Sequence, residues 1–200
     1  CVPFNEKWLT DLTQPFQDKE IVASVSKVLM PEEIWKDFDS VSKILSVKEQ
    51  KLITPLMDEK GCAYRKSVFK KIGLFDGKTF RTAGEDFDMY IKLKKVGDIA
   101  YPETKVIHYH YYNWKSRLKK ELQLSNAFGT LVRIYGNKMP KWYVGVLKAI
   151  PLFGYFIFLL SVNPFKLGLL TIMQIPLLLV VNLIYFFGFT KGFLMARQTV

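Results

Sequence analysis

Two apolar runs close to the C-terminus, residues 143–161 and 167–190, constrain the fold of this chain more than any other feature. The runs and the short connection between them contain only two charged side chains, Lys148 and Lys166. Each run approaches the ~20 residues that a helix needs to cross ~30 Å of hydrocarbon, and no polar face recurs at helical spacing. We therefore expect residues 142–200 to form a transmembrane hairpin with a short cytoplasmic tail. A buried helical hairpin of a soluble protein is the less favoured alternative.

The two runs differ in how regular they are. Lys148 lies near the start of the first run, where its ammonium group could snorkel to the lipid headgroups. Pro151 predicts a kink in the same run, so a tilted crossing and a partly interfacial position both stay open. Pro176 and Asn182 interrupt the second run, but both are tolerated in a membrane helix. We expect a tight turn between the runs at Asn163–Pro164.

The net charge of +11 is concentrated just before the first run. Residues 113–141, expected to form a basic amphipathic helix and linker, hold one acidic side chain, Glu121, against seven basic ones. These are Lys115, Arg117, Lys119, Lys120, Arg133, Lys138 and Lys141. The positive-inside rule keeps such a segment in the cytoplasm, and Lys191 and Arg197 after the second run agree with it. We expect a multi-pass protein of the cell membrane with both termini and the catalytic part cytoplasmic.

The same positive charge also indicates a binding partner. Basic residues beside a membrane anchor attract anionic lipid headgroups. A nucleic-acid interface is a weaker explanation, because the excess charge lies next to the apolar runs and the segment before it is nearly balanced. We therefore expect membrane lipids, and no nucleic acid, as partners of this segment.

Residues 1–112 mix charged and apolar side chains as a globular α/β domain does. Strands are expected at 21–29, 62–64, 98–101 and 105–111, and helices at 6–14, 31–45, 67–72 and 85–96. These strands are few for a complete sheet, so we expect further strands before Cys1. No signal peptide is visible in the first residues of the sequence. Cys1 and Cys62 lack metal-ligand spacing and favour a reducing compartment.

Three carboxylates open the expected helix at 85–96, in the run Gly84-Glu85-Asp86-Phe87-Asp88. Acidic residues in a first turn commonly do no more than satisfy the helix dipole. Helical phase separates them, however: Asp88 falls beside Lys92 at the spacing of a surface ion pair, whereas Asp86 falls on the apolar face. A carboxylate that points into the protein must be paired, bound to metal or exposed in a cleft, and in a cleft it is a candidate general base.

Two further segments carry candidate site residues. His108 and His110 are two residues apart on an expected strand, so they share one face; two imidazoles make no complete metal site, and a packed core histidine is the commoner role. The run Gly61-Cys62-Ala63-Tyr64-Arg65 combines small residues with an arginine, which permits close approach of a ligand to the backbone. An ordinary turn into a helix explains this run equally well.

These segments, taken in order, resemble the C-terminal half of family 2 glycosyltransferases. The likeness covers about residues 1–136 and rests on five elements with family-like spacing. They are Gly61 to Phe69, Ile72-Gly73-Leu74-Phe75-Asp76, Gly84 to Met89, Lys92 to Gly97, and Val106-Ile107-His108. The resemblance implies a partial GT-A fold, Rossmann-like and specific for nucleotide-diphospho-sugars, in an inverting, membrane-anchored enzyme of polysaccharide biosynthesis.

The resemblance also implies roles. Asp86 matches the base that deprotonates the acceptor hydroxyl, and Glu85 matches its partner. His108 matches a ligand of the divalent metal, Mn²⁺ or Mg²⁺, beside the donor diphosphate. Gly61, Cys62, Ala63 and Arg65 match a loop that lines the donor-sugar and acceptor cleft. Trp8-Leu9 matches a helix that follows the family's Asp-x-Asp motif.

The family's nucleotide-binding strands and Asp-x-Asp motif would lie before Cys1. Asp37-Phe38-Asp39 has the letters of the motif but falls within the expected helix at 31–45, so we interpret it as chance. We expect the chain to be the acceptor-side part of a transferase that acts on a lipid-linked or cell-surface glycan, and to be inactive by itself. The alternative is a catalytically inactive membrane protein whose soluble part binds a glycan or a protein partner.

Overall fold

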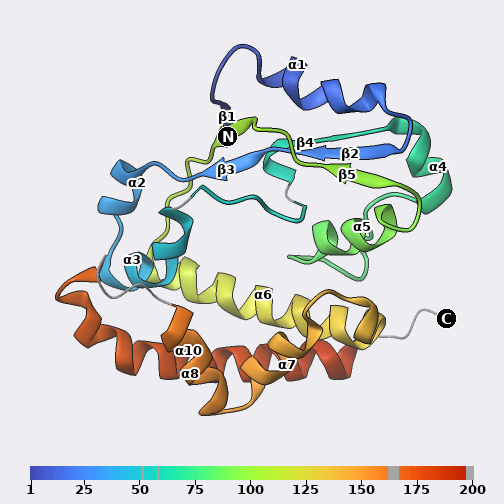
Figure 1. Cartoon of the computed structure of the whole chain (residues 1–200). Helices are drawn as coiled ribbons and strands as arrows, with labels where there is room; N and C mark the ends of the chain where they lie inside the picture. The colour runs from blue at the N-terminus through green and yellow to red at the C-terminus, as the bar shows by residue number, and fades with distance from the viewer. Residues whose placement is uncertain (51, 58, 162–166, 197–200) are drawn as a thin grey trace. The chain divides into compact units, whose positions relative to one another are not determined.

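The computed structural model describes residues 1–50, 52–57, 59–161 and 167–196 (Figure 1). The chain forms two compact units, each built from separate segments. Unit 1 contains Cys1–Trp35, Glu49–Lys78 and Glu85–His110, and unit 2 contains Lys36–Lys48, Thr79–Gly84 and Tyr111–Val200. The front of the chain is therefore not a single block, because residues 36–48 and 79–84 belong to the helical unit.

Unit 1 is mixed α/β and holds two small three-stranded sheets. The strands are β1 (Val2–Pro3), β2 (Ile21–Val25), β3 (Lys27–Leu29), β4 (Cys62–Tyr64), β5 (Asp98–Ala100) and β6 (Lys105–Ile107). In one sheet β2 pairs parallel with β5 and antiparallel with β4. In the other, β6 pairs parallel with β3 and antiparallel with β1. The predicted strand at 62–64 is confirmed, and the one at 98–101 ends at Ala100. The one at 105–111 is shorter because it ends at Ile107, and the one at 21–29 is two strands.

A break at Ser26 separates β2 from β3, where the sequence predicts one continuous strand. Ser26 is fully buried, and its hydroxyl accepts a hydrogen bond from Trp8 Nε1 at 2.9 Å and lies 3.0 Å from Thr104 Oγ1. Its amide donates to the Gly61 carbonyl at 2.8 Å. The backbone at Ser26 thus bonds outside the ladder, which ends one sheet and starts the next.

Trp8 begins helix α1 (Trp8–Thr13), which precedes the 3₁₀ turn η1 (Gln14–Gln17). The helix predicted at 6–14 is thus shorter, and its N-cap residue, Lys7, makes no side-chain cap bond. Of its apolar side chains, Leu12 is buried and Trp8 is half-buried, but Leu9 is 61% exposed. Only one turn of this helix therefore faces the core.

Helix α5 (Glu85–Leu93) packs its apolar face against the sheet. Met89 and Leu93 are fully buried in a cluster with β2 and with Ile99 of β5. Figure 1 shows α5 and α1 on opposite sides of the strands. The turn after α5 needs glycine, because a Cβ at Gly97 would lie 2.4 Å from Val22 Cγ1 and 2.6 Å from the Glu20 carbonyl oxygen.

The remaining short elements connect these parts. They are α2 (Glu32–Lys36), α3 (Ser40–Ser46), η2 (Val47–Gln50), η3 (Glu59–Gly61), η4 (Lys66–Val68) and α4 (Phe69–Ile72). The predicted helix at 31–45 is two helices, because Asp39 is an N-cap whose carboxylate accepts from the Ser42 amide at 2.9 Å. Asp37-Phe38-Asp39 thus lies between helices and not within one. The helix at 67–72 ends at Gly73, as predicted.

Unit 2 is helical in its C-terminal part. Helix α6 (Trp114–Tyr135) begins with a capping box between Asn113 and Ser116 and ends at Gly136, which starts η5 (Gly136–Lys138). Beyond it lie α7 (Trp142–Ala149), α8 (Phe153–Ser161) and α10 (Leu170–Met195). The predicted turn at Asn163–Pro164, and Arg197, lie outside the described residues.

Among the described residues, one helix is long and apolar enough to cross a membrane, α10 with 26 residues. The first apolar run is not a single helix, because α7 and α8 meet at a bend of 118°. Leu152 at this bend adopts φ +65°, a left-handed conformation that a branched side chain rarely takes. Across unit 2, Asn182 of α10 donates to the Lys148 carbonyl at the end of α7 at 2.8 Å, which satisfies a backbone group that the break sets free.

Candidate functional site

The acidic run lies in the first turn of α5, as predicted. Asp86 is half-buried, and its Oδ1 accepts a hydrogen bond from the Phe87 amide at 2.7 Å. Asp88 pairs with Lys92 Nζ at 2.6 Å, which confirms the predicted partner. The expected surface position of Asp88 is wrong, because its side chain is only 4% exposed. Among the described residues, Glu85 Oε2 is buried without a hydrogen-bond partner, so one polar atom of this turn is left for another group.

Tyr64 of β4 connects the acidic turn with the Gly61–Arg65 segment. Burial is the largest cause that raises the pKa of the Tyr64 phenol above its ordinary range, followed by the Cys62 thiol, and Glu59 and Asp86 act in the same direction. These groups therefore lie within electrostatic range of one hydroxyl. That hydroxyl donates to Met57 Sδ at 3.4 Å, and Cys62 Sγ is 3.6 Å from the same sulfur. The structure thus brings Met57, Cys62 and Tyr64 together, and Asp86 is the smallest of the causes that raise the pKa of Tyr64.

The small residues of this segment serve packing within unit 1. A Cβ at Gly61 would lie 2.9 Å from Ser26 Cβ and 3.0 Å from Val106 Cγ1. Ala63 is paired with Ser24 in the ladder between β4 and β2. The group that approaches the Gly61 backbone is therefore Ser26. A substrate-binding role for Gly61, Cys62 and Ala63 stays a prediction.

Arg65 binds main-chain carbonyls of the loop before β2. Its Nε donates to the Ile21 carbonyl at 3.0 Å, and its Nη2 donates to those of Phe16 at 2.9 Å and Asp18 at 2.8 Å. The guanidinium also lies 5.4 Å from the centre of the Phe16 ring. These contacts fix η1 against the start of β2, which is a structural role. The predicted contact of Arg65 with substrate is untested.

His108 lies directly after β6, beyond the end of the sheet. Its amide donates to the Leu29 carbonyl at 2.8 Å, its Nδ1 is 3.0 Å from Cys1 Sγ, and its ring centre is 5.4 Å from that of His110. Cys62 is opposite Val25 at the end of β2, and His108 is beside Leu29 at the end of β3. Val25 and Leu29 are four residues apart, which corresponds to about 13 Å of extended chain. His108 thus lies beside the end of β3, in a different sheet from Cys62, which lies beside the end of β2.

The described residues contain no group of three or more His, Cys, Asp and Glu side chains that could hold a metal ion. One half-buried imidazole with a thiol against its Nδ1 offers nitrogen and sulfur donors, whereas Mg²⁺ and Mn²⁺ prefer oxygen. The residues present do not by themselves fit the metal that the resemblance implies.

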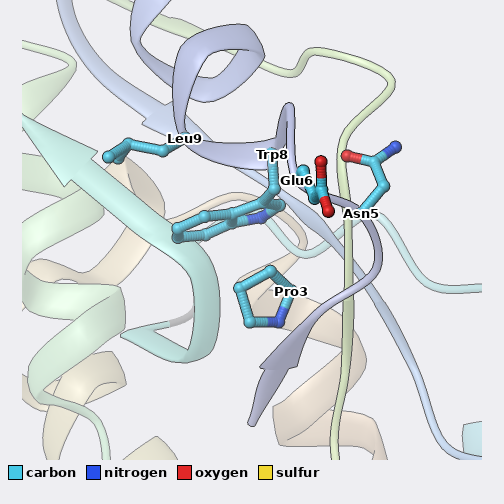
Figure 2. Close-up of a pocket in the computed structure, with 5 residues that line it drawn as sticks. All are labelled: Pro3, Asn5, Glu6, Trp8 and Leu9. Carbon is cyan, nitrogen blue, oxygen red and sulfur yellow. The ribbon is translucent and has the colours of Figure 1, made fainter.

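A shallow pocket of about 520 Å³ lies elsewhere in unit 1, between β1 and α1. Figure 2 shows the Trp8 indole above the Pro3 ring, with Leu9 on one side and Asn5 and Glu6 on the other. Trp8 is held in place by its bond to Ser26. An aromatic face beside amide and carboxylate groups is suited to an amphipathic ligand such as a sugar.

Several of these residues have no signal in the sequence. Met57 and Glu59 reach Tyr64 from a loop without regular spacing, and the bond between Trp8 and Ser26 joins residues whose types predict nothing about each other. Comparison of the chain with protein-family models, with curated proteins and with solved structures gives no match in any of the three.

Proposed function

We propose that unit 1 is the acceptor-side part of an inverting glycosyltransferase of family 2. One observation carries the proposal: the Asp86 carboxylate is half-buried in the first turn of α5, whose Met89 and Leu93 pack against β2 and Ile99 of β5. α5 is followed by β5, which is parallel to β2. In parallel α/β sheets, ligands bind outside the carboxyl ends of the strands, and the start of a helix that leads into such a strand is at that end.

Asp86 has the chemistry that inversion needs. A sugar hydroxyl is a poor nucleophile near neutral pH, so a positioned base is required. In the proposed step, an Asp86 oxygen takes the proton as the acceptor oxygen attacks the anomeric carbon. The bond from that carbon to the donor diphosphate breaks, and its electron pair leaves with the diphosphate. One displacement inverts the anomeric centre and needs no protein nucleophile. The nucleotide of the donor is bound by the part of the domain that the resemblance places before Cys1.

A divalent metal belongs to the same proposal, although the proton transfer to Asp86 does not depend on it. The contact of 3.0 Å between Cys1 Sγ and His108 Nδ1 supports the metal indirectly, because residues that immediately precede Cys1 would reach His108. An Asp-x-Asp motif there would add the carboxylate oxygens that the described residues lack. A divalent ion bound in this way supplies a Lewis acid for the leaving diphosphate.

The proposed test uses a protein in which this chain is joined to a nucleotide-binding half. Asp86→Asn should abolish transfer to the glycan acceptor and leave the Kd for the nucleotide-sugar unchanged. Asp98→Asn is the matched control, since Asp98 is an exposed carboxylate paired with Lys94 at 2.6 Å; it should retain full turnover. Near-normal turnover by Asp86→Asn would refute the proposed base. Residues 1–200 alone should show no transfer with Mn²⁺ or Mg²⁺.

A second candidate function rests on a different observation, the Trp8 pocket. If the soluble part only binds a glycan, the pocket of Pro3, Asn5, Glu6, Trp8 and Leu9 is the place that suits it. Titration with cell-wall oligosaccharides should then change the fluorescence of Trp8, and Leu9→Asp should weaken binding. Binding that depends on Asp86 but not on Leu9 favours the transferase.

We further propose that unit 2 holds the protein at the cell membrane with both ends in the cytoplasm. Two contacts within unit 2 support the proposal that both of its ends lie on the same side of the membrane. Arg133 near the end of α6 lies 5.3 Å from the centre of the Phe193 ring near the end of α10, and Thr130 Oγ1 donates to the Gly192 carbonyl at 3.3 Å. The chain thus enters and leaves its apolar part at neighbouring points. The two crossings that the sequence predicts stay a prediction.

A further inference from the structure

Helix α10 exposes a mainly apolar face, unlike a helix at the surface of a soluble protein. Its buried residues include the polar Gln174 and Asn182 and the small Gly188 and Gly192, beside the apolar Leu178, Val181, Tyr185 and Phe189. The exposed face is apolar except for Lys191 near the C-terminal end of the helix. Six apolar side chains spread along this face are 42–75% exposed: Ile172, Ile175, Leu179, Leu183, Phe187 and Leu194. Such a continuous apolar face marks a site of interaction, and its chemistry matches hydrocarbon.

Helix α6 lies along the buried face of α10, and the two helices run in the same direction (Figure 1). Glycine permits the contact, since a Cβ at Gly188 would lie 2.0 Å from Ser125 Oγ. A Cβ at Gly192 would lie 1.9 Å from the Asn126 carbonyl oxygen, and one at Gly129 would lie 2.1 Å from that of Phe189. The pairing is as close as that of membrane helices with small residues at their interface.

This pairing fixes which residues of α6 lie beside the middle of α10. Asn126 Nδ2 donates to the Gly188 carbonyl at 3.5 Å and Thr130 Oγ1 donates to that of Gly192 at 3.3 Å, so the two helices are offset by 62 residues. Both helices rise 1.5 Å per residue, so Lys115 and Lys119 are near the levels of Leu177 and Val181, within about 8 Å of the midpoint of α10. If α10 crossed the bilayer, exposed Lys119 would lie near its centre, too deep for its side chain to reach the headgroups.

We propose that α10 docks on the membrane lying in its plane, with the apolar face in the outer acyl region and α6 on the side of the headgroups and water. The proposal rests on the membrane association proposed above and not on the transfer chemistry. The charges of α6 support both an anionic lipid surface as the partner and this orientation. Lys115, Lys119 and Lys120 are available to anionic headgroups. The one carboxylate of α6, on Glu121, is paired with Arg117 at 2.9 Å.

The bend between α7 and α8 fits this arrangement. The two helices are about 12 and 13 Å long, and at 118° their ends are separated by only about 13 Å, less than half of the ~30 Å hydrocarbon thickness. Exposed Phe156 and Leu160 of α8 add to the apolar surface of unit 2. The bent pair is therefore suited to lie beside α10 at the surface.

The test measures depth along α10 in the full chain, reconstituted in phosphatidylcholine–phosphatidylglycerol vesicles. With Cys1 and Cys62 replaced by serine, single cysteines at Ile172, Leu183 and Leu194 are spin-labelled and compared with Lys119→Cys on α6. In-plane docking predicts the same depth at all three α10 positions, within about 5 Å and at roughly 5–10 Å below the headgroups, with the α6 label in water.

Three outcomes would overturn the proposal. A label at Leu183 about 15 Å deeper than both ends shows a crossing helix. Labels that all stay in water, together with a dimer in gel filtration, show that a second copy covers the apolar face. Finally, Arg133→Cys with Phe193→Cys, whose native side chains are in contact, should be joined by a short bifunctional thiol reagent in the vesicles; failure of this cross-link, with wild-type depth at Lys119, would show that α6 and α10 separate and would remove the basis of the argument.

Discussion

Arg65 can be tested for a structural role against a ligand-binding role. The family resemblance assigns it to the substrate cleft, whereas in the structure it binds main-chain carbonyls. Arg65→Ala removes three hydrogen bonds, to the carbonyls of Phe16, Asp18 and Ile21, and a contact with the Phe16 ring. The bonds to Phe16 and Ile21 are partly buried, whereas the bond to Asp18 is exposed. Truncation therefore leaves two carbonyls with incomplete access to water.

The expected loss can be worked out from these contacts. A hydrogen bond with one charged partner contributes about 1.5–3 kcal/mol, and the exposed bond to Asp18 adds little. Allowing for water that replaces part of the lost bonding, Arg65→Ala should lower the free energy of unfolding by about 2–4 kcal/mol. For a unit of this size, each kcal/mol corresponds to about 4–8 °C in Tm, so the Tm should fall by at least ~8 °C.

The assay is thermal unfolding of the full chain in a neutral detergent, followed by near-ultraviolet circular dichroism. Arg65→Lys keeps the positive charge but not the fork of donors, so it should lose about half as much stability. Lys66→Ala, at an exposed neighbour, should change the free energy by less than ~0.5 kcal/mol. An unchanged Tm in Arg65→Ala, with weaker binding of a nucleotide-sugar or glycan, would show that the side chain serves a ligand and that the structural reasoning is wrong.

Two further predictions concern unit 1. Gly97→Ala should destabilise the protein by about 2 kcal/mol or more in urea unfolding, because its Cβ would lie 2.4 Å from Val22 Cγ1; Gly77→Ala, which meets no atom within 4 Å, is the control, and equal effects would contradict the packing argument. Burial, with Tyr90 and Cys62 as lesser causes, raises the pKa of Tyr101 from 10.0 to about 12, so its contribution to stability is complete below pH 10 and lost as the pH rises toward 12. The Tyr101→Phe variant should show a flatter decline of Tm across that window, and identical declines would argue against this cause.

The helices that the sequence predicts best are those with local start and stop signals. α6 begins at the Asn113 cap and ends at Gly136, and the turn after α5 contains Gly97, all within a few residues of the predicted bounds. These signals act through neighbouring residues, so a single sequence is sufficient to find them. The order of strands and helices, and with it the mixed α/β class of unit 1, follows from the same kind of information.

The features that the sequence could not predict depend on distant partners. Nothing near Ser26 shows that Trp8 and Thr104 meet at its hydroxyl, so the break between β2 and β3 is invisible in the strand pattern. The end of α7 likewise depends on Asn182, 34 positions away. In the candidate site, helical phase predicts that Asp86 points inward and Asp88 outward, but Asp88 is the more buried of the two. Met57 comes from a loop, and Glu59 from the short turn η3, whose courses only the fold determines.

The pairing of β1 with β6 also sets the order in which the chain can fold during synthesis. Val2 is opposite Ile107 and β2 needs β5, so neither sheet closes until residues 98–107 have left the ribosome. Before that point the apolar side chains of β2 have no cover, which exposes the nascent chain to aggregation and to chaperones. The apolar helix α10 follows these strands in the sequence, so the sheets can close before α10 is complete.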